Sequence, residues 1–207
     1  MHILDESQAK NLLKKNGIPT TKFVVVNEYD ELNDINLNYP LVMKVCSKKI
    51  MHKTDVGGVI LNITNEQQLK KNFLFLKEKF GEKILIEEME EKGIEIIIGT
   101  TKDEFFDKVI MVGIGGIFTE IYKDVSFRKI PITRKDAEEM LKELKAYKVI
   151  EGVRGQRGVN EELFIDIVWR LSGLLEAAPE IAEMDLNPLI ASGDQIVAVD
   201  ARIRIEG

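Results

Sequence analysis

Residues 183–190, EMDLNPLI, and residues 198–203, AVDARI, decide how the rest of the chain is interpreted. Both stretches are apolar enough to form strands inside a protein, yet they carry Asp185, Asn187 and Asp200. Carboxylate and amide oxygens are the ligands that Mg²⁺ prefers, usually together with waters and substrate phosphates. Two edge strands with hydrated polar side chains are the alternative. We favour a metal site, because both stretches are too apolar for a wholly exposed edge.

Further upstream, a single lysine interrupts the apolar segment LVMKV, residues 41–45, which is predicted to be a strand. Burying its ammonium group is unfavourable unless an anion or solvent meets it. Lys44 therefore lies either on the hydrated face of an alternating strand or in a cleft where it binds phosphate. Its position in the sequence leaves both interpretations open.

The segment that follows, KKIMHKTDVGGV (residues 48–59), has neither a helical nor a strand period and is predicted to be a loop. Gly57 and Gly58 would let backbone amides approach a ligand closely, and Lys53 adds the positive charge that phosphate-binding loops require. A neutral imidazole can attack phosphorus near pH 7, which makes His52 a candidate phosphoryl acceptor. The simpler alternative is a surface turn with an incidental histidine.

Two glutamates, Glu87 and Glu95, lie in the stretch LIEEMEEKGIEIII, residues 85–98. Two strands joined by a turn at Gly93 would bring these carboxylates close together. They could then accept hydrogen bonds from ribose hydroxyls or from the adenine amino group. A charged hairpin exposed to water is an equally good interpretation.

The order of the predicted elements favours an α/β (α+β) fold. Local capping and periodicity signals predict helices at 5–16, 28–33, 65–80, 133–144 and 161–176, and strands at 22–26, 41–45, 59–63, 84–89, 94–100, 108–113, 117–122, 186–190 and 196–201. The glycines of GIGGIFTE, residues 113–120, lead into a strand-like run and lack the third spaced glycine of a dinucleotide-binding turn, which excludes that site.

Composition excludes several classes of protein. The chain has 207 residues and a net charge of −6, which argues against non-specific binding to nucleic acid. No apolar run approaches the roughly 20 residues that cross a bilayer, and the start of the chain lacks the features of a secretion signal. Cys46 is the only cysteine, so an internal disulfide is impossible. These features predict a cytoplasmic protein.

Taken together, these segments resemble the β subunit, or ATP-grasp domain, of ADP-forming acetate–CoA ligase, within the NDP-forming acyl-CoA synthetase superfamily. A more distant similarity is to the β subunit of succinyl-CoA synthetase. The loop HKTDVGGV and the ending EMDLNP…DAR are the most specific motifs. The shared motifs run in order along nearly the whole chain: PLVMKV (40–45), HKTDVGGV (52–59), ILIEEM (84–89), KGIEIIIG (92–99), GIGGIFTE (113–120), KDVSFRKIP (123–131), EGVRGQRG (151–158), EMDLNP (183–188) and VDARI (199–203).

The resemblance implies one ATP-grasp domain over residues 1–207, with a small lobe (1–86) and a large lobe (87–207) closing over a nucleotide. In such a domain the lysine of the central strand contacts nucleotide phosphates, the glycine loop closes over them, and the strand before the large lobe presents its backbone to adenine. The residues implied in binding ATP or ADP are Lys44, Lys53, Gly57, Gly58, Glu87, Glu88, Met89 and, for the ribose, Glu95.

The same resemblance assigns the remaining roles. Asn187 and Asp200 would bind Mg²⁺, with Asp185 beside them near the reacting phosphate. Arg128 would lie close to the path of the phosphate. His52 matches a loop histidine that is proposed to receive a phosphoryl group in relay.

The implied activity is transfer of a phosphoryl group between a phosphohistidine and ADP or ATP, within the reaction acyl-CoA + ADP + Pi ⇌ acid + ATP + CoA. The implied partner is a CoA-binding α subunit, in an α2β2-type complex. Two alternatives remain: a non-catalytic ATP-binding regulatory subunit, and an ATP-grasp ligase that acts on another carboxylic acid.

Overall fold

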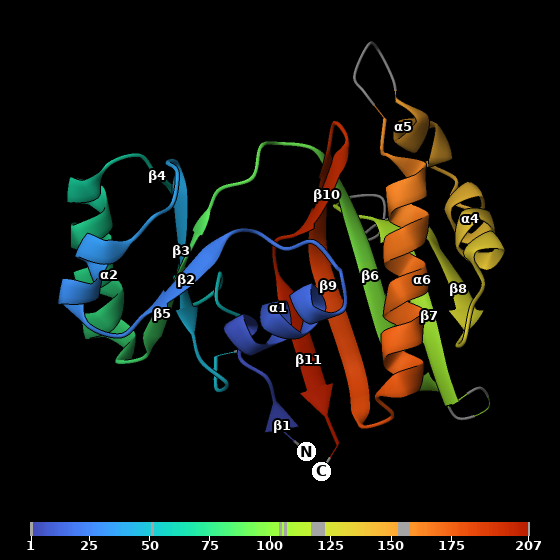
Figure 1. The fold of residues 1–207 in the computed structure, drawn as a ribbon, viewed down its shortest axis with the longest axis horizontal. Coiled ribbons are helices and arrows are strands. Elements are labelled where there is room, and N and C mark those ends of the chain that lie inside the picture. The colour runs from blue at the N-terminus through green and yellow to red at the C-terminus, as the bar shows by residue number, and fades with distance from the viewer. Residues whose placement is uncertain are drawn as a thin grey trace. The chain divides into compact units, whose positions relative to one another are not determined.

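The fold is seen in a computed structural model that describes residues 2–50, 52–103, 105, 107–116, 123–152 and 158–206. The expected strand at 117–122 lies outside the described residues, as does most of the EGVRGQRG motif. The chain forms two compact units (Figure 1): unit 1 comprises Met1–Leu4, Ala9–Thr20 and Glu91–Gly207, and unit 2 comprises Asp5–Gln8 and Thr21–Glu90. The chain thus passes between the units after residues 4, 8, 20 and 90.

Unit 2 is a four-stranded antiparallel sheet in the order β2-β5-β3-β4, covered by one long helix. Its elements are β2 (Phe23–Val26), the 3-10 helix η1 (Tyr29–Asp34), β3 (Leu41–Cys46), β4 (Val59–Ile63), α2 (Glu66–Phe80) and β5 (Lys83–Glu88). Leu69, Phe73 and Leu76 of α2 pack into a core with Met43 and Ile86 of the sheet. Every residue of β3 is buried, so the side of β3 that faces away from α2 is covered as well.

The caps of α2 confirm the sequence prediction. The Asn65 side chain accepts a hydrogen bond from the amide of Gln68 at 2.9 Å. Gly81 ends the helix with φ +67°, a left-handed conformation that suits glycine. The edge strand β4 is irregular, because Asn62 has φ +58° and the pairing register shifts between Leu41 and Met43.

Unit 1 contains an antiparallel sheet in the order β1-β11-β9-β6-β7-β8, with β10 also paired to β9. Its strands are β1 (His2–Ile3), β6 (Ile94–Asp103), β7 (Asp107–Ile114), β8 (Val125–Lys129), β9 (Ile181–Ser192), β10 (Gln195–Ala198) and β11 (Ala201–Ile205). Its helices are α4 (Arg134–Lys142), α5 (Tyr147–Glu151), α6 (Glu161–Ala177) and the larger part of α1 (Glu6–Lys15). Figure 1 shows α4 beside α6, and both helices share one apolar core with the sheet.

The predicted cap at Thr133 in unit 1 is confirmed as well. Thr133 and Asp136 form both hydrogen bonds of a capping box at the start of α4. The Asn160 side chain accepts from the amide of Leu163 at the start of α6. Among the described residues, no helix combines the length and the apolar character that crossing a bilayer requires.

The predicted strand at 196–201 is wrong in one respect, since the structure divides it into β10 and β11. Both strands pair antiparallel with β9, and Val199 and Asp200 lie between them. Proline has no amide hydrogen to donate, so the ladder cannot continue through Pro188. The pairing of β9 with β6 also shifts between Ile96 and Ile98, opposite the same point. The interruption thus falls beside Asn187 and Asp200.

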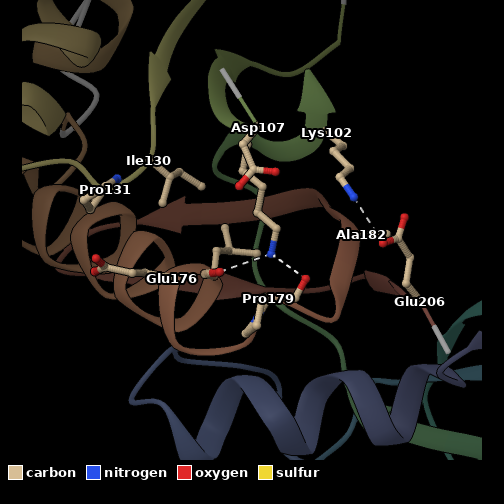
Figure 2. A pocket seen from close by; sticks show the side chains of 10 residues that line it. Lys102, Asp107, Ile130, Pro131, Glu176, Pro179, Ala182 and Glu206 are labelled. Carbon is tan, nitrogen blue, oxygen red and sulfur yellow. Dashed lines mark hydrogen bonds and ion pairs between the residues drawn. The ribbon is translucent and has the colours of Figure 1, made fainter. Parts of the chain in front are cut away.

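A buried lysine caps the C-terminal end of α6. The ammonium of Lys108 on β7 donates to the carbonyls of Leu175, Ala178 and Pro179 at 3.1–3.2 Å, and burial lowers the pKa of Lys108. A pocket of about 360 Å³ lies here, and on one side of it Lys102 points towards Glu206 (Figure 2). Carbonyls at a helix end need donors, and Lys108 supplies them.

We therefore expect Lys108→Met to lower the free energy of unfolding by about 1–3 kcal/mol, because three carbonyls each lose the hydrogen bond from Lys108. Lys102→Met is the matched control, since Lys102 is an exposed lysine of the same pocket, and it should cost no more than about 0.5 kcal/mol. Urea unfolding followed by circular dichroism measures both values. Equal effects of the two substitutions would contradict the capping role of Lys108.

Candidate functional site

Lys44 lies at the centre of a buried group of charges in unit 2. Its ammonium is 2.8 Å from Glu6 Oε1 and 2.7 Å from Glu87 Oε1, and all three side chains are at most 5% exposed. The Thr21 hydroxyl donates to the other oxygen of Glu87. This geometry excludes a hydrated strand face for Lys44. The lysine instead belongs to a cluster of compensated charges, which is the state in which an ammonium group tolerates burial.

The second lysine of this cluster comes from the turn after β3. Lys53 Nζ is 2.8 Å from Glu6 Oε2, so Glu6 meets one lysine with each of its carboxylate oxygens. His52 lies next to Lys53 and is exposed. Within residues 52–58, all of which the structure describes, no hydrogen bond joins His52 to Asp55.

Gly57 and Gly58 shape this turn. Gly57 has φ +71°, and its amide donates to the Thr54 carbonyl at 3.0 Å. The Gly58 amide donates to the Lys53 carbonyl at 2.6 Å, and a Cβ added at Gly58 would lie 2.6 Å from a methyl carbon of Val45. Both glycines are thus required by the turn itself, and in this conformation their amides donate within it.

The segment from Glu87 to Met89 ends β5 and is held through its backbone. The amide of Glu88 donates to the Lys22 carbonyl at 3.0 Å, and that of Met89 to the Pro40 carbonyl at 2.9 Å. The Glu88 carboxylate accepts from the amide and the side chain of Asn38, both at 2.9 Å. The Glu87 carboxylate points instead to Lys44 and is buried.

The predicted hairpin between Glu87 and Glu95 is wrong. β5 pairs with β2 and β3 in the sheet of unit 2, whereas β6, which carries Glu95, pairs with β7 and β9 in the sheet of unit 1. Gly93 does not close a β5–β6 turn. A Cβ there would collide with the carbonyl oxygen of Ala191 on β9, so Gly93 permits a close backbone approach.

Glu95 is exposed near the start of β6. Its carbonyl accepts the Gly115 amide at 2.7 Å, and a Cβ on Gly115 would lie 2.7 Å from Glu95 Cβ. Gly115 therefore leaves room for the Glu95 side chain, which a larger residue would displace. This is a local role for one of the glycines of the GIGGIFTE motif.

Asp185, Asn187 and Asp200 lie together in unit 1. Met184 and Leu186 point into the core, so Asp185 and Asn187 share the opposite face of β9. Ala201 pairs with Leu186, and Asp200, the residue before Ala201, lies near enough to Asp185 to influence the pKa of that carboxyl. The Asp200 amide lies 3.5 Å from the Pro188 carbonyl. The assignment of these three residues to one magnesium site stays a prediction.

Two carboxylates at this point favour a bound cation. Burial and the neighbouring Asp200 raise the pKa of Asp185, against the opposing charge of Arg202. No cluster of three or more His, Cys, Asp or Glu side chains that could hold a metal occurs among the described residues. One or two carboxylates with an amide oxygen fit Mg²⁺, which completes its shell with waters and substrate phosphates. These ligands therefore fit magnesium better than a metal that takes all of its ligands from the protein.

Arg128 lies on β8, and its guanidinium forms two hydrogen bonds with the carboxylate of Glu143, at 2.9 and 2.5 Å. Ser126 donates to the same carboxylate at 2.6 Å. Arg128 and Ser126 together lower the pKa of Glu143 to about 2, and the bond to Glu143 raises the pKa of Arg128. Arg128 is therefore held in one orientation by its own unit.

Sequence reasoning missed Glu6 and Thr21 as members of the lysine cluster, and Arg202 beside Asp185. An acidic residue in the first turn of α1 is explained by the helix dipole alone, so nothing in the sequence indicates the buried partners of Glu6. Arg202 pairs directly with Asp185 across β11 and β9, so its position beside that carboxylate depends on strand pairing.

Comparison with known proteins gives a consistent family. The ATP-grasp domain family matches residues 1–205. The chain is 41% identical to the beta subunit of acetate–CoA ligase [ADP-forming] I from Pyrococcus furiosus, over 97% of this chain and 90% of that protein. It is 40% identical to the beta subunit of acetate–CoA ligase [ADP-forming] II from the same organism, over 98% and 91%.

A solved structure agrees with this result. Dinucleotide-forming acetyl-coenzyme A synthetase 1 from Ca. Korarchaeum cryptofilum, in complex with coenzyme A, Ca-AMPCP and HgCl+, superposes with a TM-score of 0.92 at 38% identity, over 99% of this chain and 94% of that chain. These matches extend over nearly all of the chain and include both units. The chain belongs to the ATP-grasp family, among the beta subunits of ADP-forming acetate–CoA ligases.

Proposed function

We propose that this chain is the nucleotide-binding subunit of an ADP-forming acyl-CoA synthetase, which moves a phosphoryl group between a phosphohistidine and ADP or ATP. The observation that carries the proposal is the match over 90% of the length of a ligase beta subunit. Another structure of the Korarchaeum synthetase is described with coenzyme A, Mg-AMPPCP and a phosphohistidine segment pointing towards the nucleotide-binding site. In unit 2, the buried lysine cluster supports the proposal independently.

Unit 2 supplies positive charge for the nucleotide phosphates. Lys44 is fixed on β3, and Lys53 belongs to a glycine turn from which it can reach a second phosphate oxygen. Glu88 and Met89 continue the backbone where adenine is proposed to bind, and Glu95 of unit 1 is proposed for the ribose. In phosphoryl transfer most of the catalysis comes from placing the groups and neutralising charge.

Unit 1 supplies the metal ligands. We assign Asn187 and Asp200 to Mg²⁺, with Asp185 on the same face of β9 as Asn187. When bound, magnesium neutralises phosphate charge and orients the phosphate oxygens. Arg128, held by Glu143, is assigned to stabilising phosphate charge during transfer.

The beta-subunit names of the relatives imply a partner subunit. We propose that the partner binds CoA, forms the acyl phosphate and carries the phosphohistidine, in an α2β2-type complex. This chain would then exchange the phosphoryl group with ADP but would not complete the full reaction alone.

The first prediction concerns Lys44. Mg-ADP at 100 times its Kd should stabilise the parent protein by about 2.7 kcal/mol, because the ligand binds only the native state. Lys44→Ala should lose most of this shift, whereas Lys71→Ala, an exposed lysine on α2, should keep it. Differential scanning fluorimetry measures each shift relative to the variant's own unliganded melting temperature. If Mg-ADP stabilised Lys44→Ala as much as it stabilises the parent protein, Lys44 would not belong to the phosphate site.

The second prediction concerns the metal. Asp200→Asn should weaken Mg-ATP binding at least about tenfold, or about 1.4 kcal/mol, because it removes an anionic ligand. Asp194→Asn changes an exposed carboxylate of the same hairpin and should have no effect. Calorimetry at several magnesium concentrations separates loss of the metal from loss of the nucleotide. An unchanged metal dependence in Asp200→Asn would exclude this residue from the site.

The third prediction concerns His52, in a chain with two histidines, His2 and His52. In phosphorylation, an imidazole nitrogen bonds to the transferred phosphorus while the bond to the leaving oxygen breaks. The complex of this chain with its partner, incubated with γ-labelled ATP and magnesium, should carry acid-labile, base-stable label on the peptide containing His52. His2→Asn should retain that label and His52→Asn should lose it. If rapid quenching found label on the partner's histidine alone, His52 would not be a phosphoryl acceptor and would have only a structural role in the turn.

A further inference from the structure

The carboxylate of Glu6 joins the two lysines that are assigned to phosphate binding. Its Oε1 lies 2.8 Å from Lys44 Nζ and its Oε2 lies 2.8 Å from Lys53 Nζ. The Glu6 side chain is only 2% exposed, so its negative charge is poorly screened by water. Any role of Glu6 in phosphate binding rests on the proposed function, in which both lysines meet nucleotide phosphate.

The two lysines are held very differently. Lys44 lies in the middle of β3, with its backbone paired to β4 on one side and β5 on the other, and Glu87 meets it as well. Lys53 begins a turn that is tied to the sheet at its far end, where the Val45 amide donates to the Gly58 carbonyl at 2.8 Å. The side chain of Lys79 also reaches this turn, at the Val56 carbonyl. Lys44 thus lies on a strand that is paired on both sides, whereas Lys53 lies on a turn outside the sheet.

Glu6 is itself firmly placed. It occupies the first turn of α1, where the helix dipole favours an anion, and Asp5 caps the helix by accepting the amide of Gln8 at 3.1 Å. Phosphate and carboxylate oxygens are anionic acceptors that compete for the same ammonium donors. A phosphate that arrives at Lys53 therefore meets a carboxylate already in place.

We propose that Glu6 is a positioning residue that acts as an internal counter-ion for Lys53. In the nucleotide-free protein it holds Lys53, and with it the turn that carries His52, against β3. Nucleotide phosphate replaces Glu6 on Lys53, while Lys44 keeps its carboxylate partners. Nucleotide binding thereby releases the turn from its anchor on α1.

The test is Glu6→Gln, which preserves the shape of the side chain and removes its charge. In the nucleotide-free protein, amide hydrogen exchange of the peptide spanning residues 52–58 should become faster, because Lys53 loses its counter-ion. Affinity for ADP and ATP should rise roughly tenfold, because phosphate no longer competes with a buried anion. Affinity for adenosine, which carries no phosphate, should stay unchanged.

Asp5→Asn is the matched control. Asp5 is the neighbouring buried carboxylate on the same helix start, and it pairs with Lys83 instead of the turn. Asparagine still caps a helix, so this variant should leave both the exchange of the turn and the nucleotide affinities unchanged.

Two results would overturn the proposal: turn exchange identical in Glu6→Gln and the parent, or affinities for ADP and adenosine that fall together. A gain for ADP and ATP cannot come from misfolding, which would lower every affinity. If the parent protein binds neither ADP nor ATP, the proposed function fails, and hydrogen exchange alone then decides whether Glu6 holds the turn.

Discussion

An ammonium group can be buried only where acceptors surround it, and this constraint organises both units. In unit 2, Lys44 is compensated by Glu6 and Glu87, which come from the start of α1 and the end of β5. In unit 1, Lys108 is surrounded by carbonyls at the end of α6. The two lysines fix distant parts of the chain for the same reason, but the partners of Lys44 are carboxylates, whereas those of Lys108 are backbone carbonyls.

The sequence predicted well whatever depends on neighbours along the chain. The Asn65 and Thr133 caps, the left-handed glycines and the amphipathic helices are local signals, and the structure has them. Strand partners are not local. The β5–β6 hairpin failed because a turn residue such as Gly93 indicates a bend without determining which sheet each strand joins. The split of β10 from β11 was not anticipated, because its cause, Pro188, lies on the neighbouring strand.

The site shows the same division. Asp185, Asn187 and Asp200 could be found because polar residues in apolar strands are visible in the sequence, and antiparallel pairing then brings them together. Lys44 could be noticed but not interpreted, since its decisive partner lies 38 residues earlier in the chain. Glu6 could not be recognised at all. Its burial depends on tertiary packing that no local pattern encodes.

The irregular edge strand β4 has a consequence for how copies of this protein behave when concentrated. A regular exposed edge offers unpaired amides and carbonyls to any other strand and so promotes aggregation. Asn62 of β4 has a left-handed conformation, and the pairing of β4 with β3 shifts its register, so this edge is not regular. Asparagine tolerates this conformation better than most residues. A β-branched residue at this position would favour regular pairing, and a more regular β4 would offer a better template for aggregation.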